Sequence, residues 1–198
     1  GKHFPGHGDT DTDSHLALPV IHASAERMDT MELAPFKDMI AQGLGGMMVA
    51  HLYVPALDSV SGMPTTLSKQ VTTGLLKEKL GFKGLIFTDA LNMQAVSDNY
   101  PPGVVDKLAL LAGNDMLLRA ENVPRALTEI RAAIDSGLIT QQEIDSRVKK
   151  VLMVKHWCGL NRYQPIVIDH LVEDLNNPND LLLQQQLYES CLTLLANP

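Results

Sequence analysis

The chain has 198 residues, of which 45% are hydrophobic and 20% are charged, so it can build a folded core and intrinsic disorder is not expected. Its 16 basic and 23 acidic residues give a formal net charge of −7, and no cluster of lysines and arginines suggests a nucleic-acid-binding protein. The longest uncharged stretch, residues 39–57, is interrupted by His51, Tyr53 and Pro55, so no membrane-spanning helix is expected.

The first predicted elements are a helix, a strand and a second helix. Apolar residues recur at helical spacing over residues 31–42. Residues 47–54 are apolar apart from His51 and are followed by Pro55, which is typical of a strand covered on both faces. A helix is predicted over residues 68–80, with Ser68 as its candidate N-cap.

Two further strands alternate with helices in the following part of the chain. The predicted segments are a strand at 85–88, a helix at 104–112, a strand at 116–118, and helices at 124–136 and 140–157. The last helix opens with a capping box, in which a threonine is followed three residues later by a glutamate.

This order of elements predicts an α/β fold with right-handed crossovers and a parallel sheet. The strands begin roughly 30 to 40 residues apart, close to the about 31 residues that each unit of an eight-stranded (β/α)8 TIM-type barrel occupies. A doubly wound open sheet remains an alternative, although no glycine-rich dinucleotide fingerprint follows a strand.

After Trp157 the composition changes. Residues 158–180 are rich in asparagine and have only short apolar runs, which predicts a linker. Residues 181–191 are predicted to form a helix and residues 192–195 the start of a strand.

The two cysteines, Cys158 and Cys191, are far apart in the chain. Their spacing suggests neither a metal knuckle nor a disulfide framework. Their apolar neighbours predict that each is a free, buried thiol.

Reactive side chains are most concentrated in residues 2–15, which contain three histidines and three aspartates. A calcium loop of the EF-hand type fails, because Ser14 stands where that loop needs glycine and Val20 where it needs glutamate. A transition-metal site remains chemically possible, although its candidate ligands lack helical spacing. These candidates are His3, His7, Asp13 and His15.

An acid/base pair is the third interpretation of this segment. Asp13 and His15 share a face in an extended chain and could meet directly in a loop, where the carboxylate would orient the imidazole and stabilise its protonated form. A nucleophile would then come from elsewhere. Asp89 directly follows the apolar residues of a predicted strand, where barrel enzymes keep catalytic groups, although it could also cap the next helix.

Four segments together resemble glycoside hydrolase family three, in particular its bacterial β-N-acetylglucosaminidases. Residues 2–15 resemble the family's signature and residues 81–93 resemble its nucleophile segment. Residues 112–118, and His51 with residues 55–58, resemble further family blocks in the expected order.

The resemblance implies a retaining hydrolase that removes terminal β-linked N-acetylglucosamine without a cofactor or metal. By analogy Asp89 attacks the anomeric carbon, and His15, oriented by Asp13, protonates the leaving oxygen and later deprotonates water. Lys2 and His3 would bind sugar hydroxyls. His51 is a weaker candidate for the same pocket and could equally be a core histidine.

The implied substrate is an N-acetylglucosamine-containing glycan or muropeptide. Two other classes of function remain open besides the glycosidase. One is a metal-dependent hydrolase, and the other is an inactive carbohydrate-binding relative. An imidazole in place of the usual carboxylic acid would not repel an anionic acceptor, so transfer of the sugar to phosphate is a further hypothesis.

The expected domain organisation is incomplete. Lys2 and His3 would stand at the end of one barrel strand, and the three strands predicted after them bring the number of strand ends to four. Closure needs eight, so residues 1–157 are expected to be the C-terminal half of the barrel. We expect the rest of the parent polypeptide to complete it, and the chain alone not to form an active enzyme. Residues 181–198 resemble the start of a second, α/β sandwich domain, although Ala196 departs from the family's usual lysine. This tail slightly favours the bacterial cell envelope over the cytoplasm.

Overall fold

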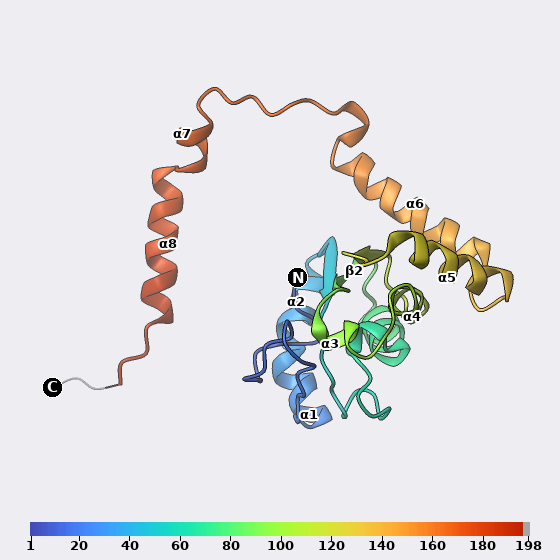
Figure 1. Cartoon of the computed structure of the whole chain (residues 1–198). Helices are drawn as coiled ribbons and strands as arrows, with labels where there is room; N and C mark the ends of the chain where they lie inside the picture. Colours follow the sequence, from blue (N-terminus) through green and yellow to red (C-terminus); the bar gives the residue numbers. More distant parts are fainter. Residues whose placement is uncertain (196–198) are drawn as a thin grey trace. The chain divides into compact units, whose positions relative to one another are not determined.

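The computed structural model of the chain describes residues 1–195 and divides the chain into two units, Gly1–Trp157 and Cys158–Pro198 (Figure 1). The strands of the first unit are β1 (Gly46–Val49), β2 (Leu85–Ala90) and β3 (Met116–Leu118). Its α-helices are α1 (Ala25–Arg27), α2 (Ala34–Ala41), α3 (Gln94–Ser97), α4 (Val104–Ala112), α5 (Val123–Asp135) and α6 (Gln141–Trp157). It also contains the π-helices η1 (Met28–Glu32) and η3 (Gln70–Lys79) and the 3₁₀-helix η2 (Thr65–Leu67).

The three strands form a parallel sheet in the order β1-β2-β3, which confirms the predicted topology. Val49 of β1 lies opposite Thr88 of β2, and the strands therefore end at a common edge. The N-terminal segment runs parallel to β1, with a bridge between Phe4 and Val49. It thus places residues 1–4 beside β1, on the side away from β2.

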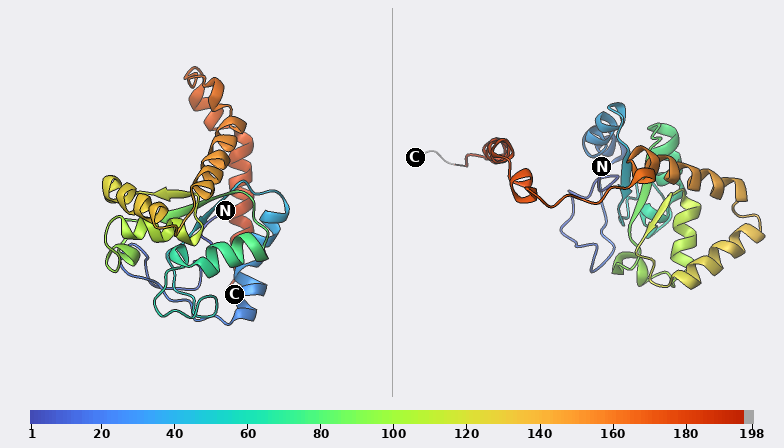
Figure 2. Two further views of the ribbon diagram at one scale, coloured as in Figure 1. Left: turned by 90° about the vertical axis from the view of Figure 1, so that its right-hand side faces the viewer. Right: turned by 90° about the horizontal axis from the view of Figure 1, so that it is seen from above.

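The main hydrophobic core lies between this sheet and helices α2 and η3. Phe4, Met47 and Ile86 have no exposed surface and are packed in one cluster with residues of both helices. A separate cluster joins α3 and α4, and α4 and α5 lie side by side (Figure 2). Burial of these apolar faces is the main contribution to the stability of the sheet.

Two local predictions about helix starts are confirmed. The Thr140 backbone N–H donates to Glu143 Oε2 over 2.8 Å, and the Glu143 N–H donates to Thr140 Oγ1 over 3.2 Å, which is the predicted capping box of α6. Ser68 Oγ accepts a hydrogen bond from the Val71 N–H over 3.1 Å, as an N-cap does.

The first predicted strand and helices differ in extent from the observed elements. The strand predicted at 47–54 ends at Val49, because the following backbone groups are bonded to threonine side chains, and Tyr53 forms only an isolated bridge to Val20. The helix predicted at 31–42 is divided into η1 and α2, and a 3₁₀ turn precedes η3. These irregularities come from tertiary contacts that local periodicity does not reveal.

The second unit contains η4 (Leu160–Arg162), α7 (Leu171–Leu175) and α8 (Pro178–Cys191). The predicted linker therefore includes two short helices, and the predicted helix at 181–191 is confirmed within α8. Residues 192–195 form no strand, contrary to the prediction, because the described part of the second unit contains no strand with which they could pair. The remainder of the predicted domain start, residues 196–198, lies outside the described residues.

Both cysteines are free but exposed, so the prediction of buried thiols was wrong. Apart from the half-buried Leu171, every described residue of the second unit is exposed, and its apolar side chains therefore form no core that could cover a thiol. Among residues 1–195, no helix combines the length and the apolar character that crossing a membrane requires.

Candidate active site

Asp89 lies near the carboxyl end of β2, where its carboxylate is fixed on one side and accessible on the other. Its Oδ1 accepts a hydrogen bond from the Ala90 N–H over 2.8 Å, and its Oδ2 lies 3.8 Å from His3 Nε2. The Asp89 side chain is 16% exposed. One carboxylate oxygen is therefore held by the backbone, while the other lies next to an imidazole.

The N-terminal segment brings His3 to this strand end. The Phe4 N–H donates to the Met48 carbonyl over 2.9 Å, and the Ala50 N–H donates to the Phe4 carbonyl over 2.8 Å. Neighbouring side chains of an extended segment point to opposite sides, so a buried Phe4 directs His3 away from the core. Lys2 is exposed and has no ion pair among the described residues.

The surroundings of His3 favour its neutral ring. Partial burial lowers the pKa of His3, and the positive charges of Lys2 and His7 lower it further, while the Asp89 carboxylate opposes the shift. A neutral ring can both donate and accept hydrogen bonds, which suits contact with hydroxyl groups.

Asp13 and His15 meet directly in an exposed loop. Asp13 Oδ1 accepts hydrogen bonds from the His15 backbone N–H over 2.9 Å and from His15 Nδ1 over 2.8 Å. These two bonds lower the pKa of Asp13, since both stabilise the carboxylate. Because the carboxylate can only accept, Nδ1 carries a proton and Nε2 is left for other chemistry.

Several contacts fix the loop that carries this pair. Asp9 forms an ion pair with Arg27 over 2.9 Å, and His7 Nε2 is hydrogen-bonded to Ser14 Oγ over 3.2 Å. When the Gln94 amide is oriented to donate, its nitrogen lies 3.2 Å from the Leu16 carbonyl. The loop therefore lies against the start of α3, a few residues after the end of β2.

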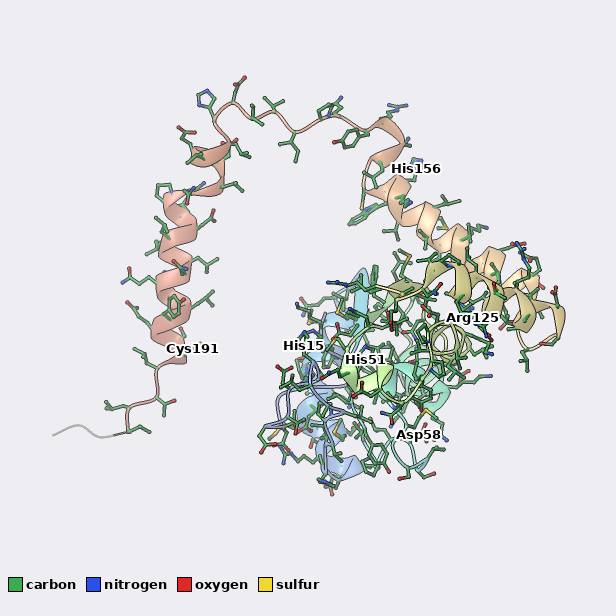
Figure 3. The ribbon with its side chains drawn as sticks, viewed as in Figure 1. His15, His51, Asp58, Arg125, His156 and Cys191 are labelled. Atoms are coloured by element: carbon green, nitrogen blue, oxygen red, sulfur yellow. The ribbon has the colours of Figure 1, made fainter. Side chains whose placement is uncertain are left out.

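The structure thus forms two pairs, His3 with Asp89 and Asp13 with His15. Within residues 1–195, no hydrogen bond or ion pair joins one pair to the other. Figure 3 shows His15 on the N-terminal loop and His51 in the body of the first unit.

His51 is completely buried, and both of its ring nitrogens have partners. Nδ1 lies 2.8 Å from Thr66 Oγ1, and Nε2 lies 3.0 Å from the Ala90 carbonyl oxygen. Burial lowers the pKa of His51, while the Ala90 carbonyl and the Asp89 charge oppose the shift. The expected contact with a sugar has no support here, because His51 exposes no surface to a ligand.

Sequence reasoning missed three residues around the site. Thr66 holds the His51 ring, Gln94 lies beside the loop, and Asn114 Nδ2 donates to the Thr66 carbonyl over 2.9 Å. Asn114 lies in a segment that resembles the family, but no local pattern assigns a partner to it. Its contact partner is 48 residues away in the chain, so only the folded structure identifies it.

The possible metal cluster of the N-terminal segment is not assembled. In the described part of the chain, no group of three or more histidine, cysteine, aspartate or glutamate side chains is arranged to hold a metal ion. The His3 and His7 rings lie 6.1 Å apart between centroids, and His15 Nδ1 is bonded to Asp13. The histidines and aspartates instead form separate pairs.

Comparison with known proteins gives similar chains that are considerably longer. Beta-hexosaminidase A of Pseudoalteromonas piscicida is 29% identical over 215 residues, a match that covers 99% of this chain and 36% of that protein. A solved glycoside hydrolase family 3 β-N-acetylglucosaminidase from a Paenibacillus species is 40% identical with a TM-score of 0.79, covering 84% of this chain and 32% of that one. A solved β-glucoside phosphorylase is 27% identical with a TM-score of 0.76, covering 82% and 31%. The chain thus spans about a third of the length of these relatives.

The sequence profile described as "Glycosyl hydrolase family 3 N terminal domain" matches residues 1–154. The α/β fold of the first unit agrees with this match, since its parallel sheet aligns with solved family structures. The chain belongs to glycosyl hydrolase family 3, in its N-terminal domain.

Proposed function

We propose that the full-length polypeptide containing this chain is a retaining β-N-acetylhexosaminidase that removes terminal β-linked N-acetylglucosamine. The observation that carries the proposal is the preassembled pair of Asp13 and His15, which lies on a loop packed beside the end of the strand that bears Asp89. The names of the related β-hexosaminidases support the same activity and the same sugar.

Asp89 is the proposed nucleophile. Its carboxylate attacks the anomeric carbon and forms a covalent glycosyl-enzyme bond, while the bond between that carbon and the leaving oxygen breaks. The Ala90 N–H holds Oδ1, so the reacting oxygen in this proposal is Oδ2, on the side of His3.

His15 is the proposed acid and base. In the first step the protonated ring gives its Nε2 proton to the leaving oxygen. In the second step the neutral ring takes a proton from water, whose oxygen attacks the anomeric carbon while the bond to Asp89 breaks. Asp13 holds Nδ1 throughout and stabilises the protonated ring.

Lys2 and His3 are the proposed contacts to sugar hydroxyls. Lys2 is exposed, and His3 lies next to Asp89, so hydrogen bonds from both would orient the sugar toward the nucleophile. The proposed substrates are N-acetylglucosamine-containing glycans or muropeptides, and release of the sugar from each class measures the preference.

Replacement of the nucleophile provides the first test. Asp89→Asn should lower kcat on an aryl N-acetyl-β-glucosaminide by more than about 10³-fold, because the amide cannot form the glycosyl ester. Asp98→Asn, at an exposed position beyond α3, should leave kcat unchanged. Covalent trapping by a slow substrate, followed by mass spectrometry, should label a peptide that contains Asp89. Activity retained by Asp89→Asn would refute the nucleophile.

The acid role predicts a dependence on the leaving group. His15→Ala should lower kcat/KM on substrates with poor leaving groups by about 10² to 10⁴-fold. The loss on activated aryl glycosides should be much smaller, because their leaving groups need no proton. His22→Ala, another exposed histidine, is the matched control. Equal losses on both substrate types would contradict the role of an acid.

Phosphate is a second acceptor worth testing, since the proposed acid/base is an imidazole rather than a carboxylate and one similar structure is a β-glucoside phosphorylase. Product analysis in phosphate buffer would show N-acetylglucosamine 1-phosphate if the sugar is transferred to phosphate. Free N-acetylglucosamine alone would leave hydrolysis as the reaction.

Two alternatives can be separated from this proposal. A metal-dependent hydrolase would lose activity in a chelator, whereas the proposed mechanism would not. An inactive carbohydrate-binding relative would bind the sugar without ever being labelled at Asp89.

A further inference from the structure

The position of His51 is set by the register of the two central strands. Val49 of β1 lies opposite Thr88 of β2, and continuing this register by two residues brings His51 level with Ala90, the last residue of β2. The observed distance of 3.0 Å between His51 Nε2 and the Ala90 carbonyl oxygen agrees with this register. A buried side chain thereby links the end of β1 to the residue after Asp89.

The hydrogen-bond partners determine where the proton lies on the His51 ring. A carbonyl oxygen can only accept, so Nε2 must carry a proton and donate to Ala90. Thr66 Oγ1 lies 2.8 Å from His51 Nδ1 and 2.5 Å from the Ala50 carbonyl oxygen, and its single proton can serve one of these two acceptors at a time. Burial lowers the pKa of His51 and favours the neutral ring, whose unprotonated Nδ1 takes that proton as acceptor. When the Thr66 hydroxyl donates to His51, the Ala50 carbonyl keeps a hydrogen bond from Thr65 Oγ1 over 2.6 Å. Every polar group in this buried set therefore has a partner.

Thr66 is itself fixed from a third strand. Its backbone carbonyl accepts a hydrogen bond from Asn114 Nδ2 over 2.9 Å, and both residues are completely buried. Asn114 lies just before β3, at the amino end of that strand, so the network connects the segment after β1 with Ala90 of β2 and with the residues that precede β3. Asn114 Oδ1 is buried without a hydrogen-bond partner among the described residues, whereas Asn114 Nδ2 donates to both the Thr66 and the Ala109 carbonyls. These two bonds hold Thr66 and Asn114 in one geometry.

Ala90 is bonded on both sides of its backbone. Its carbonyl accepts from His51, and its N–H donates to Asp89 Oδ1 over 2.8 Å. We propose that His51 is a positioning residue for Asp89, which acts through Ala90 and does not touch the sugar. This inference rests on the proposed role of Asp89 as nucleophile, and it assigns to His51 a function different from the substrate contact expected from the sequence.

Two amide variants in the full-length polypeptide separate positioning from general packing. His51→Gln can place a side-chain nitrogen near the Nε2 position and keep the donor to Ala90, whereas His51→Asn reaches only toward Thr66. We expect His51→Asn to lower kcat by about 10²-fold with KM changed little, since a small misplacement of a reacting group has such an effect. His51→Gln should retain kcat within about tenfold of the unchanged enzyme, because the nucleophile stays in place.

Thr66 provides a second pair of variants. Thr66→Val removes the hydroxyl with little change of shape and should lower kcat, whereas Thr66→Ser keeps the hydroxyl and should have a kcat close to that of the unchanged enzyme.

Thermal unfolding serves as the control for the two His51 variants, because each buries one amide and both should unfold at similar temperatures. Equal kcat values for His51→Gln and His51→Asn at similar stability would overturn the proposal.

A spectroscopic measurement tests the contact without using activity. In ¹⁵N-histidine-labelled protein, the His51 Nε2 resonance should be that of a protonated nitrogen at neutral pH. An unprotonated Nε2 would overturn the inference, whatever reaction the enzyme catalyses. If Nε2 is protonated but Asp89→Asn remains active, the proposed nucleophile fails while the observed contact stands.

Discussion

The three candidate histidines of the site differ in exposure and therefore in chemistry. The His15 side chain is 73% exposed and bonded to Asp13, the His3 side chain is 32% exposed and close to Asp89, and His51 is completely buried. An exposed ring next to a carboxylate can exchange protons with a substrate. A buried ring with two partners can only hold its neighbours in position.

Burial of His51 predicts a pH dependence of stability. Its pKa is lowered in the folded state, so the unfolded chain binds more protons as the pH falls below about 6.5, the ordinary value for histidine. The stabilising contribution of the neutral ring is therefore complete above that pH and is lost below it. Between pH 7.5 and pH 5, the free energy of unfolding should fall more in the unchanged protein than in His51→Gln, as measured by urea denaturation. An equal fall in both proteins would contradict this sign.

At the scale of elements, glycines allow close approach between a helix end and its neighbour. Gly113 ends α4 with φ of 117°, in the left-handed region, and a Cβ atom there would collide with Thr73 Oγ1 of η3. Gly137, just after α5, has φ of 74° but no atom within 4 Å of its ideal Cβ position. Both positions have a positive φ, and Gly113 differs in being packed against η3 and in having a φ further from the left-handed region that other residues can adopt.

A pair of alanine variants separates these two effects. Gly137→Ala should destabilise the protein by about 1 kcal/mol, from backbone strain alone. Gly113→Ala should cost about 1 to 3 kcal/mol more, because the methyl group overpacks the contact between α4 and η3 and because alanine adopts a φ of 117° less readily than 74°. Denaturant unfolding of both variants measures the difference. Equal losses would show that α4 and η3 move apart without cost.

At the scale of the whole molecule, the two units differ in how they are stabilised. The first unit has several buried clusters, including Phe4 and Ile86, whereas nearly every described residue of the second unit is exposed. Residues 163–168 have neither helix nor strand. We therefore propose, as the sequence predicts, that residues 158–180 are a linker toward a second domain.

Limited proteolysis tests this division. Chymotrypsin should cut the full-length polypeptide after Tyr163, which is 71% exposed, before it cuts after the half-buried Tyr53 or Tyr100. The early product should end close to Trp157 and resist further digestion, as shown by mass spectrometry of a time course. A first cut at Tyr53 or Tyr100 would contradict the division.

The sequence by itself determined the order of the elements, the parallel sheet and the position of Asp89 at the end of β2. It also determined the capping box at Thr140 and the Ser68 cap. All of these depend on residues that are only a few positions apart, through apolar periodicity, glycine and proline stops, and caps. The family signature in residues 2–15 is likewise a continuous segment.

Only the tertiary structure decided which of these residues meet. The pairing of His3 with Asp89 and the burial of His51 between Thr66 and Ala90 join residues from separate elements. The exposure of Cys158 and Cys191 was also unpredictable from their apolar neighbours, because burial depends on whether other elements cover a segment. Local signals specify helices and strands, but the contacts of a side chain are specified by chain segments that can be far away in the sequence.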